Sequence, residues 1–113
     1  MIGRIEPGPR MSRAVVHNDT IYTAGQVDRT SGDVAGQTRT ILARIDAILA
    51  QAGSDKSKVL SATIWLADIG TFEEMNAEWD AWIAPDNPPA RATVEARLAG
   101  PEYLVEIAVI AAK

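Results

Sequence analysis

The pattern of apolar positions predicts a helix in the middle of the chain. Between residues 41 and 52 the apolar side chains recur at intervals of three and four, as on the buried face of an amphipathic helix. They are Ile41, Leu42, Ile45, Ile48, Leu49 and Ala52. A polar connection, residues 28–36, precedes them, and Gly53 stands where a left-handed cap ends a helix. One face of this helix is therefore expected to be buried.

A second helix is predicted after residue 70. Thr71 followed by Glu74 is the spacing of a capping box, and Pro85 closes the segment. The inward stripe of this helix contains one polar residue, Asn76. Its members are Phe72, Met75, Asn76, Trp79, Trp82 and Ile83.

Five other segments have the composition of β-strands. Residues 12–17 and 20–25 flank Asn18-Asp19, which suits a hairpin turn. Residues 90–98 and 104–111 form two more strands, separated by Gly100-Pro101. Residues 58–67 alternate between two rows, neither of them strongly polar. One row is Leu60, Ala62, Ile64 and Leu66, and the other is Val59, Ser61, Thr63 and Trp65.

The order of these elements is hairpin, helix, strand, helix and two strands. Right-handed crossovers place both helices on one face of a mixed sheet, so the predicted fold class is α+β. Two helices on one side leave apolar positions of the sheet uncovered, and part of the sheet is expected to pack on another subunit. These positions are Val59, Thr63, Trp65, Val105, Ile107 and Val109.

Length and composition limit the possible architecture. The chain has 113 residues, of which 47% are hydrophobic and 23% charged, as expected for a single globular domain spanning residues 1–113. No apolar run approaches the ~20 residues that cross a bilayer, and the N-terminus lacks the apolar region of a signal peptide. We therefore expect no membrane partner and a cytoplasmic location.

Charge and residue content also narrow the chemistry. The formal net charge of −4 repels phosphate backbones, so nucleic acid is a poor partner. The absence of cysteine excludes disulfides and thiolate ligands, and a single histidine, His17, leaves no ligand set for zinc. Next to a hairpin turn, His17 is expected to be a solvated surface residue.

Arg91 is the first candidate functional residue. It lies where a proline-rich loop enters a strand, and alternation places it on one face with Thr93, Glu95 and Arg97. A guanidinium held by a rigid loop suits bidentate recognition of a carboxylate. The alternatives are a surface arginine and a structural ion pair, and the spacing does not choose among the three.

Glu106 is the second candidate, because it interrupts an otherwise apolar strand. A carboxylate in this position suits the orientation or activation of a water molecule. The alternative is a buried ion pair with an arginine. The tryptophans at strand and helix spacings are expected to pack in the core or at an interface rather than to stack on a ligand: Trp65, Trp79 and Trp82.

A family resemblance extends over nearly the whole chain. The run Pro89-Ala90-Arg91-Ala92-Thr93-Val94, followed by Leu98 and Val105-Glu106-Ile107, resembles the C-terminal signature of the RidA/YjgF reactive intermediate deaminases. Further matches, in the family's order, are Tyr22-Thr23-Ala24-Gly25-Gln26, Gln37, Ala52-Gly53, Asp68, Phe72 and Met75-Asn76. The Arg13–Asn18 region and Trp79-Asp80-Ala81-Trp82 are similar to a YoaB-like branch.

The resemblance implies a fold, an assembly and an activity. The fold is chorismate-mutase-like, and three subunits form a homotrimer with a central barrel and a cleft at each interface. In active relatives the arginine matching Arg91 grips a substrate carboxylate, and the glutamate matching Glu106 positions the attacking water. The implied substrates are 2-imino acids, hydrolysed to 2-keto acids and ammonium without a cofactor or a metal.

The resemblance also places other residues at the cleft and marks three departures. The backbone at Gly25 and the side chain of Asn76 are implied to lie there, although Asn76 also suits a structural role. Met11, Ala24 and Thr93 stand where the best-known deaminases carry tyrosine, serine and cysteine. Deamination is the leading hypothesis. The alternative is a module that binds a keto acid without hydrolysis, and ribonuclease activity ranks last because the chain has no basic stripe.

Overall fold

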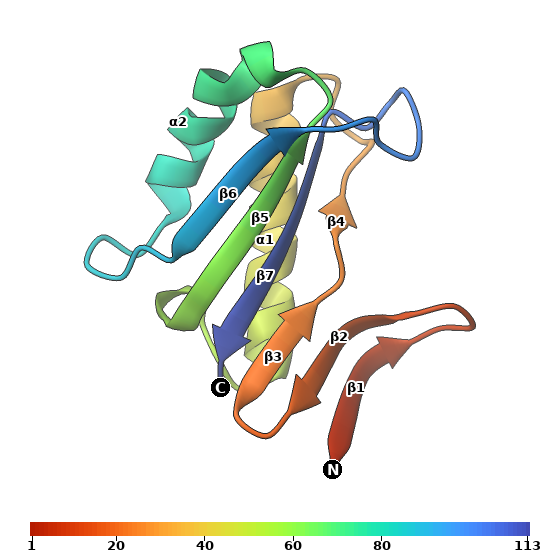
Figure 1. Ribbon diagram of the computed structural model, residues 1–113, viewed down its shortest axis with the longest axis vertical. Coiled ribbons are helices and arrows are strands. Elements are labelled where there is room, and N and C mark those ends of the chain that lie inside the picture. Colours follow the sequence, from red (N-terminus) through yellow and green to blue (C-terminus); the bar gives the residue numbers. More distant parts are fainter.

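The computed structural model describes all 113 residues and has two helices packed on a mixed β-sheet (Figure 1). The strands are β1 (Ile2–Pro7), β2 (Ser12–His17), β3 (Thr20–Thr23), β4 (Gln26–Val27), β5 (Val59–Leu66), β6 (Ala90–Glu95) and β7 (Val105–Ala112). The helices are α1 (Val34–Gln51) and α2 (Phe72–Trp82), and short 3₁₀ turns span Lys56–Lys58 and Ile69–Thr71.

The sheet confirms the predicted α+β class and adds two strands that were not predicted. Its order is β1-β2-β3-β7-β5-β6, with the short β4 pairing on β7. Only β5 and β6 pair in parallel, as the crossover through α2 requires. The unpredicted strands are β1, at one edge of the sheet, and β4, which continues the line of β3 along β7 (Figure 1).

The predicted hairpin between β2 and β3 is confirmed. Asn18 occupies the turn with a φ of 55°, in the left-handed region that asparagine tolerates better than most residues. The strand after the turn ends at Thr23 rather than at residue 25. Beyond it the Ala24 N–H still donates to the Arg13 carbonyl of β2 at 2.9 Å, and the chain pairs with β7 again at Gln26 and Val27.

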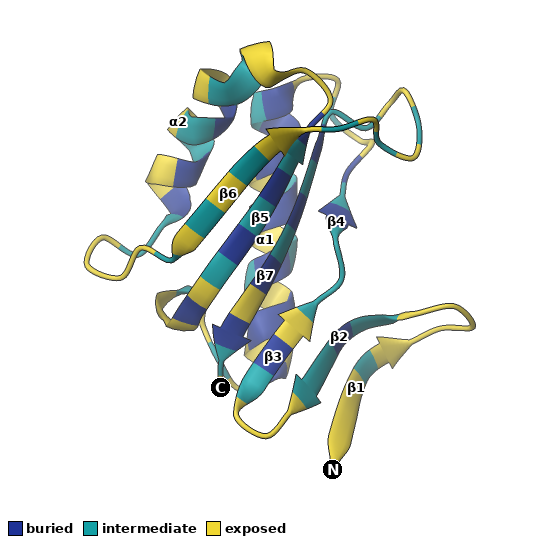
Figure 2. Cartoon of the chain, in the orientation of Figure 1, coloured by how far each residue is buried: buried dark blue, intermediate teal, exposed yellow.

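The core lies between the helices and one face of the sheet. Alternate residues of β5 and β7 are buried, which Figure 2 shows as alternating bands along both strands. The predicted stripe of α1 is buried as expected, and Gly53 follows it with a φ of 78°. Trp79 and Trp82 belong to this core, with ring centroids 5.2 Å apart, so the packing role expected of them is confirmed.

Two details of the helix termini differ from prediction. Helix α1 begins at Val34, inside the predicted polar connection, because the Asp33 carboxylate caps it by accepting a hydrogen bond of 2.7 Å from the Gly36 N–H. The prediction of a capping box at the start of α2 is wrong. The Thr71 hydroxyl donates to the carbonyl of Asp68, and the Glu74 carboxylate accepts from the Ala35 N–H. Glu74 therefore joins the starts of the two helices.

The row assignment of β5 was wrong at its first residues. A β-bulge between Val59 and Ser61 shifts the register, so Val59 is buried with Ala62, while Leu60 is 53% exposed. The predicted list of uncovered positions was therefore only partly right. Four of its members are buried under the helices: Val59, Val105, Ile107 and Val109.

The open face of the sheet nevertheless carries apolar side chains. Thr63 and Trp65 of β5 lie there beside Glu106, Ala108 and Ile110 of β7, as the strand register shows. Large hydrophobic residues exposed on this face or its edge strand include Tyr22, Val94 and Ile110. No helix of the protein has the length and apolar character that a membrane crossing needs.

Candidate functional site

Arg91 lies at the start of β6, under helix α2. Its neighbour on β5 is the buried Ala62, so its side chain leaves the sheet on the face that the helices cover. The guanidinium carbon stands 5.6 Å from the ring centroid of Phe72 and 5.3 Å from that of Trp79. These contacts hold the guanidinium by cation–π attraction. None of the chain's three ion pairs involves Arg91, so the ion-pair alternative finds no partner within the chain.

Two polar atoms on the strand and the helix that position this arginine are buried without a hydrogen-bond partner. They are the Oγ1 of Thr93, two residues along β6 on the same face, and the Oδ1 of Asn76 on α2. The amide nitrogen of Asn76 donates to Glu73 at 3.3 Å, which leaves its oxygen free. Because buried polar atoms are almost always paired in folded proteins, these two atoms indicate a place where a further molecule or a second chain supplies the partner.

Glu106 lies on β7, on the opposite face of the sheet from Arg91. It pairs with Trp65 of β5 on one side and with Val27 of β4 on the other. Its side chain fills the space beside Gly25: a Cβ added at Gly25 would overlap the Glu106 carboxylate and stand 2.9 Å from its Cδ. Glu106 also takes part in none of the three ion pairs. The glycine therefore provides the room in which this carboxylate sits.

Gly25 also lines a cleft of about 440 Å³ beside the β2–β3 hairpin and β4. Three residues implied by the family resemblance meet here, namely Met11, Ala24 and Gly25. The charged residues of the cleft are Glu6, Arg13 and Arg44. Met11 is 63% exposed, so the position that carries a phenol in the best-known deaminases here presents a flexible apolar side chain to the cleft.

A buried carboxylate that the sequence did not reveal is linked to this cleft through Arg44. Asp28 is 3% exposed. Burial alone would raise its pKa, but hydrogen bonds from the Thr30 hydroxyl and from the backbone N–H groups of Thr30 and Ser31, with the nearby Arg44 guanidinium, hold the pKa below its usual range. Arg44 lies 3.9 Å from the carboxylate and donates a hydrogen bond to the Val27 carbonyl. This network fixes β4 beside Glu106.

The predicted site residues therefore fall into two groups within one chain. Arg91, Thr93 and Asn76 belong to the helix-covered side of β6, while Glu106 and Gly25 lie at the opposite face, with Met11 and Ala24 in the adjoining cleft. A small substrate cannot touch both groups of a single chain, because the sheet lies between them.

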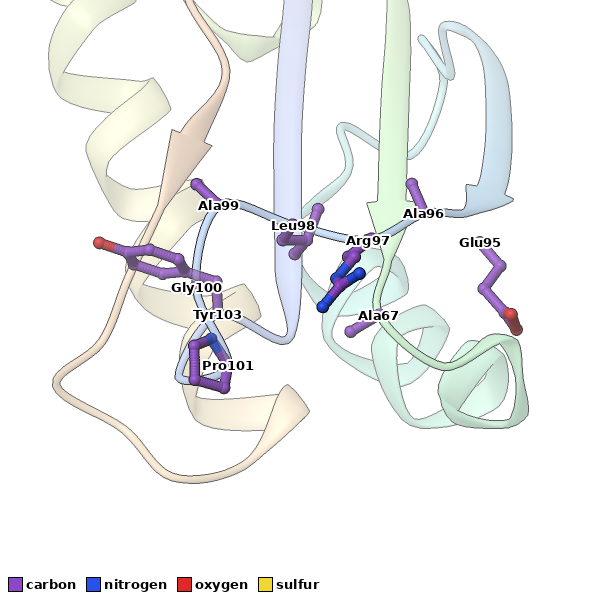
Figure 3. Close-up of a pocket in the computed structure, with 9 residues that line it drawn as sticks. All are labelled: Ala67, Glu95, Ala96, Arg97, Leu98, Ala99, Gly100, Pro101 and Tyr103. Atoms are coloured by element: carbon purple, nitrogen blue, oxygen red, sulfur yellow. The ribbon is translucent and has the colours of Figure 1, made fainter.

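A larger hollow of about 660 Å³ lies beyond the end of β6. Figure 3 shows the Arg97 guanidinium inside it, between Glu95 and Tyr103. The predicted strand extended to residue 98, but β6 ends at Glu95 and residues 96–98 belong to the loop that follows. None of the site residues predicted from the sequence lines this hollow.

Sequence reasoning missed several residues that shape the two groups. Trp79 was expected to be a core residue, and it also supports Arg91. Arg13 and Gln26 meet in the cleft through a 3.2 Å hydrogen bond, although 13 positions separate them. The only sequence signal for Arg44 was a positive charge next to the apolar stripe of α1, which is compatible with many surface positions.

Comparison with known proteins supports one family throughout the chain. The family model described as endoribonuclease L-PSP matches residues 1–113. A RutC family protein of Haemophilus ducreyi is 46% identical over 113 residues, covering 99% of this chain and 97% of that protein. The RutC family protein YoaB of Escherichia coli K12 is 46% identical over 111 residues, covering 98% and 97%.

Solved structures give the same assignment. A YjgF family member from Neisseria meningitidis superimposes with a TM-score of 0.98 at 49% identity, covering 100% of this chain and 95% of that chain. The fold is that of a small α+β protein of this type. The chain belongs to the YjgF family, the family that the endoribonuclease L-PSP model describes. The resemblance inferred from the sequence is confirmed at the level of the family.

Proposed function

We propose that the protein is a deaminase that hydrolyses small 2-imino acids to 2-keto acids and ammonium in the cytoplasm. We propose further that it acts as a homotrimer in which each site forms between two subunits. The observation that carries both proposals is the division of the polar residues between the two faces of the sheet. One set of residues contains the arginine that binds the carboxylate, and the other contains the glutamate that positions water. A neighbouring subunit must therefore complete each site.

Arg91 has the properties of a carboxylate clamp. The Phe72 and Trp79 rings lie within 5.6 Å and 5.3 Å of its guanidinium carbon and restrict its motion. No carboxylate of the same chain forms an ion pair with it. A planar guanidinium held in this way binds a carboxylate through two parallel N–H···O hydrogen bonds. The unpaired Thr93 hydroxyl and Asn76 carbonyl supply further hydrogen bonds to the bound imino acid.

Glu106 of the neighbouring subunit takes the role of general base. Its carboxylate accepts a proton from water, and the resulting hydroxide adds to the imine carbon to form a carbinolamine. Glu106 returns this proton to the imine nitrogen, which completes the neutral carbinolamine. The carboxylate then accepts the proton of the carbinolamine hydroxyl and transfers it to the amino nitrogen, so that ammonia leaves as the carbonyl forms and takes up a proton from water to become ammonium. One water is consumed and no electron is transferred. Because imines hydrolyse spontaneously, holding the water and the imine together supplies the acceleration.

A second function is favoured by the altered cleft. Met11, Ala24 and Thr93 replace the tyrosine, serine and cysteine of the best-known deaminases, so the site lacks their phenol, hydroxyl and thiol. Arg91 by itself suffices to bind a keto acid. Binding without turnover would make the protein a metabolite-sensing module. The endoribonuclease in the family description finds no support in this chain, whose formal net charge is −4.

The experiment that separates these functions measures ammonium and keto acid released from freshly generated 2-iminobutanoate. Wild-type protein is compared with Arg91→Ala and with the spontaneous reaction. Acceleration by wild-type protein that is lost in Arg91→Ala supports the deaminase and the clamp together. A folded wild-type trimer that binds 2-oxobutanoate without accelerating hydrolysis would establish the binding module instead.

A further inference from the structure

The cleft beside Gly25 contains an arginine that the reaction above does not use. Arg13 lies on β2 and lines the cleft with Met11, Ala24 and Gly25. Its position is tied to the site at two points, because its carbonyl accepts from the Ala24 N–H at 2.9 Å and its guanidinium meets Gln26. Arg13 and Gly25 line the same cleft, and the Glu106 carboxylate lies against Gly25.

The Arg13 guanidinium is held in place by its neighbours, and one of its nitrogens is free. Nη1 donates to the Gln26 Oε1 at 3.2 Å, and Nε lies 3.6 Å from Glu6. Gln26 is 5% exposed and is itself anchored, because its amide nitrogen donates to the Ala24 carbonyl at 3.0 Å. The hydrogen bonds and ion pairs of the chain thus use Nη1 and Nε and leave Nη2 for a ligand.

The other charges of the cleft do not cancel this positive group. Arg44 is occupied by the Val27 carbonyl and by Asp28. Glu6 pairs with Arg13 through Nε only, and its side chain is 52% exposed, so solvent screens this pair. An anion in the cleft can therefore bind the free Nη2 of Arg13, whose guanidinium is held in place by the buried Gln26.

We propose that Arg13 is a specificity-determining residue that binds a second carboxylate, at the end of the substrate side chain. The inference rests on the proposed deaminase function. Arg91 of one subunit holds the carboxylate next to the imine carbon, Glu106 of the next subunit faces that carbon, and the side chain of the substrate extends past Gly25 toward Arg13. The preferred substrates are dicarboxylic 2-imino acids rather than aliphatic monocarboxylic ones.

Four variants test this assignment by two measurements. Arg13→Gln removes the charge, and Arg13→Lys retains it. Arg4→Gln removes an exposed charge on the neighbouring strand β1, outside this cleft, and Arg97→Gln removes the arginine of the other hollow. Deamination of freshly generated 2-iminobutanoate and 2-iminoglutarate gives kcat/KM for each protein, and calorimetry gives the affinities for 2-oxobutanoate and 2-oxoglutarate.

Wild-type protein is expected to prefer the dicarboxylic compounds. Arg13→Gln is expected to lower that preference by roughly tenfold, the loss of one charge-assisted hydrogen bond, through a loss of kcat/KM and affinity that is larger for the dicarboxylic than for the monocarboxylic compounds. Arg13→Lys keeps most of the preference, and Arg4→Gln keeps all of it. If Arg13 merely supported Gln26, its substitution would change kcat/KM and affinity equally for the monocarboxylic and the dicarboxylic compounds.

Two results would overturn the inference while leaving the deaminase proposal intact. One is hydrolysis of 2-iminobutanoate with no dicarboxylate preference that depends on Arg13. The other is loss of the preference in Arg97→Gln instead of Arg13→Gln. Failure of the wild-type protein to accelerate either imine would instead overturn the proposed function, together with the substrate preference derived from it.

Discussion

Gly25→Ala is the substitution whose effect follows most directly from the structure. The backbone of Gly25 does not lie in the left-handed region, so alanine meets no conformational barrier there. Its Cβ would overlap the end of the Glu106 side chain and stand 2.9 Å from Cδ, closer than ordinary van der Waals contact. The carboxylate must retreat by roughly 1 Å, and a displacement of this size at a reacting group costs about a hundredfold in rate.

The same substitution is expected to leave the fold intact. The atom that must move is the end of a flexible side chain, and replacing glycine by alanine stabilises the folded state by about 0.4–1 kcal/mol where the backbone permits it. The melting temperature should therefore change by only a few degrees. Gly32→Ala is the matched control, because a Cβ added there meets no atom within 4 Å.

The assay is the steady-state hydrolysis of 2-iminobutanoate, with thermal unfolding measured on the same preparations. We expect kcat to fall by about two orders of magnitude in Gly25→Ala and to be unchanged in Gly32→Ala. Full activity in a folded Gly25→Ala protein would refute the reasoning, since it would mean that the position of the Glu106 carboxylate does not matter for the reaction.

Two further predictions concern buried polar groups. Asp28→Asn should lower the free energy of unfolding by about 1–3 kcal/mol at pH 7, because it removes a carboxylate that accepts hydrogen bonds from Thr30 and Ser31. The depressed pKa of Asp28 stabilises the folded protein above the unfolded pKa of about 3.9, and this stabilisation is lost as pH falls through the folded value. The difference in urea midpoint between wild-type protein and Asp28→Asn should therefore shrink toward pH 3. A difference that is constant from pH 7 to pH 3 contradicts this. Thr93→Val should keep or raise the melting temperature, since its buried Oγ1 has no partner in the chain, while kcat/KM for 2-iminobutanoate falls; equal losses of stability and activity would show that the hydroxyl has a structural role.

The sequence predicted the elements that carry a long periodic pattern. Helix α1 spans 18 residues, and the predicted stripe is buried, because burial of one face imposes the helical period on the choice of residues. The buried face also extends back to Val34, before the predicted stripe. The short elements escaped detection. Strand β4 has two residues, which is too few for any alternation, and the six residues of β1 lie at an edge where almost every position is exposed.

The register of β5 shows a second limit of pattern reading. Strict alternation placed Leu60 with Ala62, and one bulge reversed the faces of Val59 and Leu60. A bulge depends on how two strands pair, and therefore on contacts between residues 59–61 and 110–111, which a local pattern does not contain.

The candidate site was predictable as a set of residues but not as an arrangement. Arg91 and Glu106 stand out locally, one at the entry of a strand and the other inside an apolar run. Their positions on opposite faces depend on the pairing of β5 with both β6 and β7. The Phe72 and Trp79 rings around Arg91 come from a helix that crosses over from β5, so only the tertiary structure reveals this contact.

Mixing of two inactive variants tests the shared site most directly. The Arg91→Ala and Glu106→Gln proteins are denatured, combined in equal amounts and refolded together. If each site takes Arg91 from one subunit and Glu106 from its neighbour, random assembly restores intact sites to about a quarter of the interfaces, and hydrolysis of 2-iminobutanoate should return to about a quarter of the wild-type rate. Mixed trimers that form but remain as inactive as their parents would contradict a site shared between subunits.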